Sequence, residues 1–255
     1  MITAEQYIQN LRDLGDRRIY LMGQKVSDFT EHPMIRPSIN ACAMTYKLAE
    51  QPEHEDLMTA TSHLTGKRIN RFTHVFQSPQ DLVAKVKMQR LCGNMTGVCF
   101  QRCVGMDALN AMWSTTYEMD QKHGSTYHQR FKEYVKQWQE EDWTVDGCMT
   151  DPKGNRGLAP SAQADPDLFL RVVERKKDGI VVRGAKMHQT GVINSHEILV
   201  MPTQTMREAD DDYAVAFAVK ADDPSLIYIY GRQSCDTRKL EKTKVDVGKI
   251  GRAHV

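Results

Sequence analysis

The sequence predicts an α+β protein in which a helical N-terminal domain precedes an antiparallel β domain. In the first half of the 255 residues, apolar side chains recur every three or four positions, the period of an amphipathic helix. In the second half, short β-branched runs are separated by turn residues, a pattern typical of antiparallel strands. Because the period changes between Asp142 and Thr150, we expect a helical domain over residues 1–142 and a β domain over residues 143–249.

The first two expected helices each begin at a recognisable signal. Thr3 and Gln6 have the spacing of a capping box, in which each side chain satisfies a backbone N–H of the other residue. Pro37 suits the start of a second helix, because an N–H at that position has no helical partner. The apolar residues expected on the inner faces of these helices are Tyr7, Ile8, Leu11, Leu14, Ile39, Cys42, Tyr46 and Ala49.

Three further helices are expected before the domain boundary. Ser78 and the Pro79-Gln-Asp sequence after it supply an N-cap, a proline at the first helical position and an early carboxylate. The run after Gly97 has no helix breaker except Gly105, which predicts one helix carrying both Cys99 and Cys103. The apolar residues that mark these helices are Leu82, Val83, Val86, Leu91, Ala108, Leu109, Met112, Trp113, Phe131, Tyr134, Val135 and Trp138.

The second half is expected to contain a hairpin and three more strands. Asp178-Gly179 is a strong turn dipeptide, and apolar runs over residues 168–173 and 179–183 flank the connection. Further strands are expected over residues 197–201, 213–219 and 226–230.

The composition excludes several classes of protein. A formal net charge of +1 gives no overall field that would attract nucleic acid. No apolar run approaches the roughly 20 residues that span a bilayer, and the N-terminus lacks the basic start and apolar core of a signal peptide. The six cysteines are scattered, unlike those of a secreted disulfide framework. We therefore expect a cytoplasmic protein that binds neither nucleic acid nor membrane.

The pair Cys99 and Cys103 is the most informative feature of the chain. On a helix, residues four apart share a face, with Cβ atoms about 5–6 Å apart. Two thiolates so placed suit neighbouring irons of an iron–sulfur cluster or one metal ion, and they suit a disulfide poorly. Cysteine also packs often as a small apolar residue, so a pair of core cysteines is the alternative that spacing alone leaves open.

Two loops carry the other candidate residues. The loop over residues 148–156 is rich in backbone donors and contains Lys153 and Arg156, so it is either a cradle for a pyrophosphate or a surface turn. The segment 184–196 follows a strand, and its hydroxyl and amide side chains beside glycine suit hydrogen bonds to the polar edge of a heterocycle. The alternative for this segment is a polar β-turn. Its candidate residues are His188, Gln189, Thr190, Asn194 and Ser195.

Short segments throughout the chain carry a resemblance to a known family. They are Met1–Tyr7, Thr30–Pro33, Cys99–Cys103, Met149–Gly154, Arg183–Gly191 and Ser195–Glu197. These segments resemble the 4-hydroxyphenylacetate 3-hydroxylase family of flavoproteins, and the similarity extends from the start of the chain to about Gly248. The cysteine pair resembles the dehydratase branch of that family, because its hydroxylase members carry no cysteines there.

The resemblance implies a fold and two cofactors. The fold is acyl-CoA-dehydrogenase-like: a helical N-terminal domain, a β-barrel, and a C-terminal helical bundle that this chain is expected to lack. The cofactors are FAD and a [4Fe-4S] cluster, with Cys99 and Cys103 as two ligands and Gln101 facing the flavin and substrate cleft. The other two ligands, a His and a Cys, and the proton-transfer residues are expected beyond the chain. The segments that match flavin contacts contain Met149, Thr150, Asp151, Lys153, Asn155, Arg156, His188, Gln189, Thr190 and Gly191.

The resemblance also implies a reaction. The dehydratase branch converts 4-hydroxybutyryl-CoA to crotonyl-CoA by a flavin-radical and Lewis-acid mechanism, with vinylacetyl-CoA Δ-isomerase activity at the same site. It implies an acyl-CoA substrate and a homotetramer. Two alternatives stand beside this reading: a reduced-flavin-dependent aromatic monooxygenase, which would bind no iron, and an inactive flavin-binding fragment.

The last six residues, Ile250–Val255, have a separate explanation. A widely used sequencing adapter encodes them in one reading frame. We therefore expect the natural protein to continue past Gly248 and these residues to be read-through. A short basic natural tail is the alternative.

Overall fold

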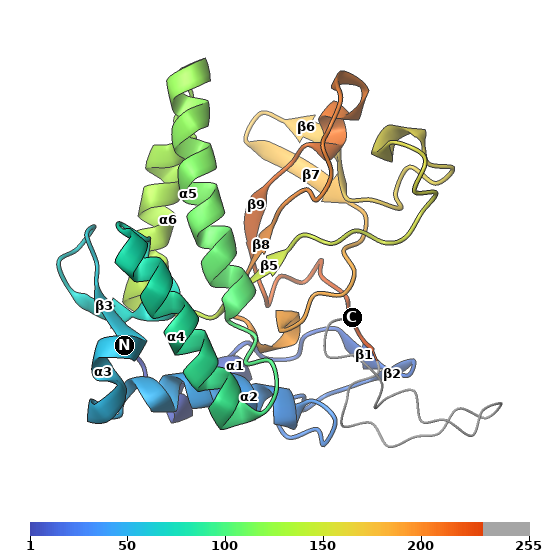
Figure 1. Ribbon diagram of the computed structural model, residues 1–255. Helices are drawn as coiled ribbons and strands as arrows, with labels where there is room; N and C mark the ends of the chain where they lie inside the picture. The colour runs from blue at the N-terminus through green and yellow to red at the C-terminus, as the bar shows by residue number, and fades with distance from the viewer. Residues whose placement is uncertain (232–255) are drawn as a thin grey trace.

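The computed structural model describes residues 1–231, in which a helical half and a β-rich half lie side by side (Figure 1). The expected read-through tail and the end of the β domain lie outside the described residues. The α-helices are α1 (Ala4–Asp13), α2 (Arg36–Ala49), α3 (Glu55–Met58), α4 (Pro79–Thr96), α5 (Cys103–His123) and α6 (Tyr127–Glu141). The strands are β1 (Ile19–Leu21), β2 (Gln24–Lys25), β3 (Thr59–Thr61), β4 (Arg68–Asn70), β5 (Val145–Cys148), β6 (Arg171–Lys176), β7 (Gly179–Arg183), β8 (Glu197–Val200), β9 (Phe217–Lys220) and β10 (Tyr228–Tyr230).

Three of the expected helix starts are confirmed. Thr3 and Gln6 form a reciprocal capping box at α1, and Pro37 lies in the first turn of α2. Ser78 and Asp81 form a second reciprocal pair at the start of α4. These local signals fix where the three helices begin, because each satisfies or removes backbone N–H groups that have no helical acceptor.

The predicted buried faces are confirmed for α1 and α2, whereas α4 buries a different face from the one expected. Tyr7 and Tyr46 are fully buried, and their rings stack with centres 4.7 Å apart. In α4 the buried side chains are Met88 and Cys92. The three apolar residues at the start of α4 are about half exposed: Leu82 (50%), Val83 (55%) and Val86 (52%).

The prediction of one helix carrying both cysteines is wrong. Helix α4 ends at Gly97 with φ 65°, and α5 begins only at Cys103. Between them Gln101 has φ 64°, a left-handed conformation that no α-helix accommodates. Cys99 therefore lies in a loop, while Cys103 is the first residue of a helix. No helical turn therefore sets their spacing.

Helices α5 and α6 stand side by side and pack against the β half (Figure 1). Gly105 allows this contact, because a Cβ there would lie 1.9 Å from the Val145 carbonyl oxygen of β5. A core of Leu109, Val135 and Trp138 fills the space between the helices and the sheet. The start of α5, and with it Cys103, is thus fixed against the first strand of the β half.

The β half contains the expected hairpin but no closed barrel within residues 1–231. Strands β6 and β7 pair antiparallel around Asp178-Gly179, although β6 begins at Arg171 and not at 168. The strand expected over 213–219 is replaced by a 3₁₀ turn ending at Tyr213, followed by β9. The remaining strands form mixed sheets: β5 and β8 pair parallel, β8 and β9 antiparallel. The expectation of a purely antiparallel domain is therefore wrong, because β5 and β8 enter their sheet in the same direction.

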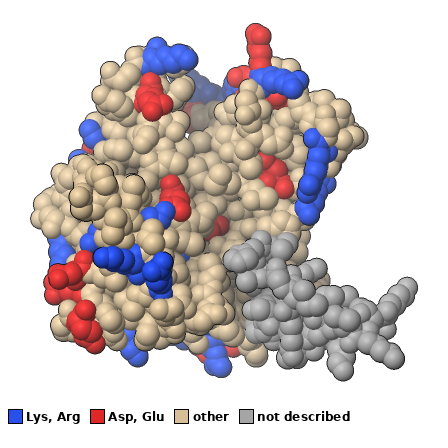
Figure 2. Space-filling model, in the orientation of Figure 1, with Lys and Arg blue, Asp and Glu red and all other residues tan. Residues whose placement is uncertain are grey.

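The two halves are also joined through a sheet. Strand β10, from the end of the described chain, pairs parallel with β1 of the helical half. Figure 2 shows that charged side chains on the viewed face form small separate groups of both signs, as the near-zero net charge predicts. No helix within the described part of the chain is long and apolar enough to span a membrane.

Candidate functional site

The thiols of Cys99 and Cys103 are in contact although no helix joins them. Both residues are half-buried, and a hydrogen bond links the two thiols. That bond, followed by burial, raises the pKa of the Cys103 thiol, because two thiolates side by side repel each other. Bound iron would offset this repulsion, so the pair fits two ligand positions of a metal group. No set of three or more His, Cys, Asp or Glu that could hold a metal occurs within residues 1–231.

Gln101 joins the cysteine loop to the β half. Its side chain is buried, and its Oε1 accepts a hydrogen bond from the Asn194 amide. Gly191 lies against it so closely that a Cβ there would be 2.9 Å from the Gln101 Cβ. The structure thus brings together two segments that sequence reasoning had singled out separately.

Lys186 holds the two expected flavin loops together, and the sequence analysis did not select it. Its ammonium group donates to Asp151 Oδ1 at 2.6 Å, to the Met149 carbonyl at 2.8 Å and to the Met201 carbonyl at 2.9 Å. The Lys186 and Asp151 side chains are only 10% and 9% exposed. Because three segments converge on one ammonium group, Lys186 determines how the loops sit relative to each other.

A pocket of about 260 Å³ lies beside these loops. Its lining includes the expected residues Thr150, Asp151, Lys153, Asn155, Arg156 and His188, together with residues that were not expected: Pro152, Gly154, Leu158, Phe169, Thr203 and Gln204. The other candidates, Met149, Gln189, Thr190 and Gly191, do not line it. Gln189 instead ties the loops, since its amide donates to the Thr150 carbonyl at 2.9 Å.

His188 enters the pocket wall through an unusual backbone conformation. Its φ is 60°, in the left-handed region that residues other than glycine rarely adopt. A hydrogen bond from the Met187 N–H to the Thr150 carbonyl, 2.9 Å long, holds the preceding residue in place. The strained turn is thus maintained by contacts across the two loops, an arrangement common in ligand-binding sites.

Asp146 is a buried carboxyl group that sequence reasoning missed. It is fully buried in β5, its Oδ1 has no hydrogen-bond partner, and its Oδ2 accepts from the Cys148 thiol at 3.3 Å. Burial is the main cause that raises the pKa of Asp146 to about 7, and the nearby Cys99 adds to it. The Cys148 thiol therefore donates a hydrogen bond to this buried carboxyl group. An acidic residue in a run of buried strand residues was the available signal.

Replacing Asp146 by asparagine is expected to stabilise the chain at neutral pH. The pKa of Asp146 is higher in the folded than in the unfolded state, so its destabilising effect is small below pH 4, grows as the pH rises from about 4 to 7 and levels off above that. Thermal unfolding should give equal midpoints for both proteins at pH 4. At pH 8 the variant should melt at least about 4 °C higher, which corresponds to roughly 2 kcal/mol. If the unfolding midpoints of the two proteins differed by the same amount at pH 4 and pH 8, the raised pKa of Asp146 would be contradicted.

Nearly the whole chain matches one protein family. The family model described as 4-hydroxyphenylacetate 3-hydroxylase N terminal matches residues 3–252. The chain belongs to this family. Among curated members of the 4-hydroxyphenylacetate 3-hydroxylase family, the chain is 63% identical over 249 residues to a 4-hydroxybutyryl-CoA dehydratase/vinylacetyl-CoA-Δ-isomerase from Clostridium aminobutyricum, which covers 97% of the chain and 51% of the relative. It is 27% identical to the oxygenase component of 4-hydroxyphenylacetate 3-monooxygenase from Thermus thermophilus, over 89% of the chain and 46% of the relative.

Solved structures of this family give the same order of similarity. An oxygen-tolerant archaeal 4-hydroxybutyryl-CoA dehydratase from N. maritimus superimposes with a TM-score of 0.89 at 53% identity, covering 94% of this chain and 48% of that one. The oxygenase component of 4-hydroxyphenylacetate 3-monooxygenase complexed with FAD gives 0.73 at 26% identity, over 90% and 46%. The chain thus has the fold of one half of these enzymes, and it spans about half the length of the relatives it matches.

Proposed function

We propose that this chain is the N-terminal half of a 4-hydroxybutyryl-CoA dehydratase that also has vinylacetyl-CoA Δ-isomerase activity. The observation that carries the proposal is the contact between the Cys99 and Cys103 thiols, in a chain 63% identical to a protein of that name. The proposal includes the complete acyl-CoA-dehydrogenase-like architecture, an acyl-CoA substrate, a cytoplasmic location and a homotetramer. The exposed apolar side chains at the start of α4 support a face that is covered in the complete protein.

The proposed cofactors are FAD and a [4Fe-4S] cluster. FAD supplies one-electron chemistry when bound, and the cluster supplies a Lewis acid toward the hydroxyl group of the substrate. Cys99 and Cys103 would hold two irons. Complexes of family members with FAD support FAD binding. We assign its site to the loops 149–156 and 188–191, which lie together beside the pocket.

Two residues of this chain would hold the parts of the proposed site in place. Lys186 would keep the two flavin loops at a fixed separation. Gln101 would hold the cysteine loop against Gly191. Both side chains are buried or nearly so, and both already have hydrogen-bond partners. Such preorganised groups require no rearrangement when substrate binds.

An assay of the full-length protein tests the proposal. The gene would be extended past Gly248, and the protein would be purified without oxygen and given 4-hydroxybutyryl-CoA. We expect crotonyl-CoA to form, and vinylacetyl-CoA to isomerise to the same product. The alternative is the aromatic monooxygenase, the class to which the more distant FAD-bound oxygenase relative at 26% identity belongs. Hydroxylation of 4-hydroxyphenylacetate with reduced flavin, without dehydration, would establish that alternative.

Thr190→Val tests the assignment of the second flavin loop. Loss of one hydroxyl hydrogen bond of about 1 kcal/mol should weaken FAD binding roughly fivefold. The dissociation constant would be measured by fluorescence titration of the flavin-free, full-length protein. Thr190→Ser keeps the hydroxyl group and should bind FAD like the wild type. Equal affinity in all three proteins would remove Thr190 from the site.

A further inference from the structure

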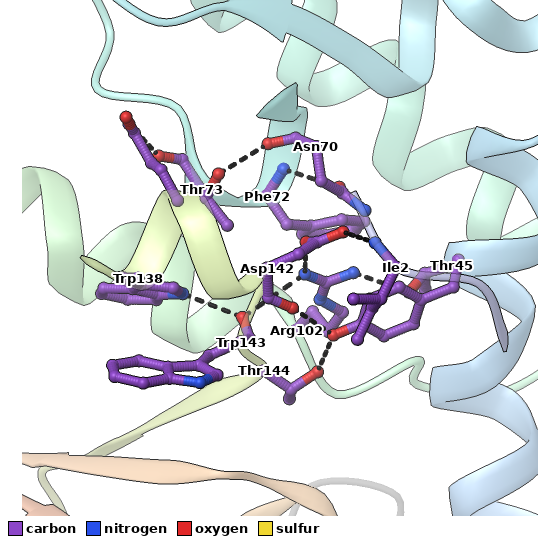
Figure 3. A network of polar contacts seen from close by, with 12 residues as sticks. Ile2, Thr45, Asn70, Phe72, Thr73, Arg102, Trp138, Asp142, Trp143 and Thr144 are labelled. Carbon is purple, nitrogen blue, oxygen red and sulfur yellow. Dashed lines mark hydrogen bonds and ion pairs between the residues drawn. The ribbon is translucent and has the colours of Figure 1, made fainter. Parts of the chain in front are cut away.

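Arg102 lies inside the segment that carries the two cysteines, and its side chain is only 2% exposed (Figure 3). Its guanidinium group donates to Asp142 Oδ1 at 3.2 Å and to Thr45 Oγ1 at 3.3 Å. The guanidinium carbon lies 4.1 Å from the centre of the Tyr46 ring and 4.9 Å from that of Phe72. A buried cation with an ionic partner, a hydroxyl acceptor and two aromatic faces is held in one orientation.

Asp142 extends this contact to other elements. Its side chain is 1% exposed, and its Oδ2 accepts the Ile2 N–H at 3.2 Å (Figure 3). Its carbonyl oxygen accepts the Tyr46 hydroxyl at 2.8 Å. Asp142 itself ends α6 in the left-handed conformation, with φ 49°. The ion pair therefore connects the cysteine segment to the N-terminus, to α2 and to the junction of α6 and β5.

The three residues between the cysteines are all buried, and each is held by a different part of the molecule. Phe100 packs against Phe72, with ring centres 5.6 Å apart, and Gln101 bonds to Asn194. Arg102 is the residue joined directly to Cys103, where α5 begins without a side-chain cap. A displacement of Arg102 would therefore move the first residue of α5 relative to Cys99.

We propose that Arg102 is a positioning residue, whose ion pair with Asp142 holds the Cys99 and Cys103 thiols at the spacing that one iron–sulfur cluster needs. The identity of the metal group rests on the proposed function, but the thiol spacing does not. Removing the guanidinium leaves Asp142 buried without its cation, and the segment moves to let water reach it. Any group that must bridge both thiols then binds more weakly.

Phenylarsine oxide tests the spacing on the chain itself. One arsenic forms two As–S bonds with two nearby thiols and releases water. The wild type should bind one equivalent at Cys99 and Cys103. Arg102→Met should bind it ~10-fold more weakly, because the effective concentration of the second thiol near the arsenic falls. Cys99→Ser supplies the background of the other cysteines.

Arg71→Met is the matched control. Arg71 is also buried, but its guanidinium group donates to backbone carbonyls outside the cysteine segment, among them that of Thr59 at 2.6 Å. It should bind phenylarsine oxide like the wild type. Equal affinity in the wild type and Arg102→Met would overturn the proposal, and so would an equal loss in both arginine variants.

The anaerobically purified full-length protein provides the second readout. Arg102→Met should hold ~10-fold less iron and sulfide with unchanged FAD, a loss typical of residues that orient metal ligands. Arg102→Lys keeps the charge without the planar fork, and it should hold iron with an altered electron paramagnetic resonance spectrum. Wild-type iron and an unaltered spectrum in both variants would overturn the role of Arg102. A third outcome separates the two proposals. If the wild type holds no iron but Arg102→Met still binds the arsenical more weakly than the wild type, the proposed function is overturned and the role of Arg102 in thiol spacing is supported.

Discussion

Substituting either Cys99 or Cys103 by serine is expected to remove nearly all iron from the full-length protein. A serine hydroxyl does not ionise at neutral pH as a thiol does, so one ligand position of the proposed cluster is lost. From about four irons per chain, we expect each variant to retain less than ~10%. Iron and sulfide would be measured after anaerobic purification and again after chemical reconstitution.

Cys92→Ala is the matched control for these variants. Cys92 is buried in the core beneath α4, and burial raises the pKa of its thiol to about 12. The variant should keep its iron while losing some stability. Full iron content in either serine variant would return Cys99 and Cys103 to the role of core cysteines.

Lys186→Met is expected to lose FAD and to destabilise the fold. The change leaves Asp151 without its ionic partner and removes one hydrogen-bond donor each from the Met149 and Met201 carbonyls. Breaking a buried ion pair typically costs about 3–5 kcal/mol. Since both side chains here are about one-tenth exposed, we expect roughly 3 kcal/mol, or a fall of at least about 6 °C in the midpoint of thermal unfolding.

Two further variants separate stability from loop geometry. Lys186→Met combined with Asp151→Asn removes both charges, so it should recover part of the stability while FAD stays lost. Lys177→Met lies in the exposed turn between β6 and β7 and should change neither property. If Lys186→Met retained wild-type FAD affinity, Lys186 would not be the residue that sets the distance between the flavin loops.

The local features of the fold were predictable because their signals are local. The capping boxes at Thr3 and Ser78, and the turn at Asp178-Gly179, depend on residues at most three positions apart. The family resemblance is confirmed. Within the described residues, α6 ends at Glu141 and β5 begins at Val145. The sequence therefore predicted the main helices and the branch of the family, but not α3 or the short strands β1–β4 within the first half.

The predictions that were wrong concern features that depend on contacts between residues far apart in the sequence. The helix through Cys99 and Cys103 is interrupted at Gln101, whose left-handed backbone lies against Gly191, 90 residues further on. The parallel pairing of β5 with β8 joins segments about 50 residues apart, and no local pattern encodes it. Lys186 was overlooked for the same reason, because its three acceptors come from segments that only the fold brings together.

Iron, sulfide and flavin analysis of the anaerobically purified full-length protein tests the central claim most directly. We predict about four irons, about four sulfides and about one FAD per chain. FAD without iron would contradict the dehydratase proposal. It would then favour the flavin-dependent monooxygenase and leave the contact between Cys99 and Cys103 as a matter of packing.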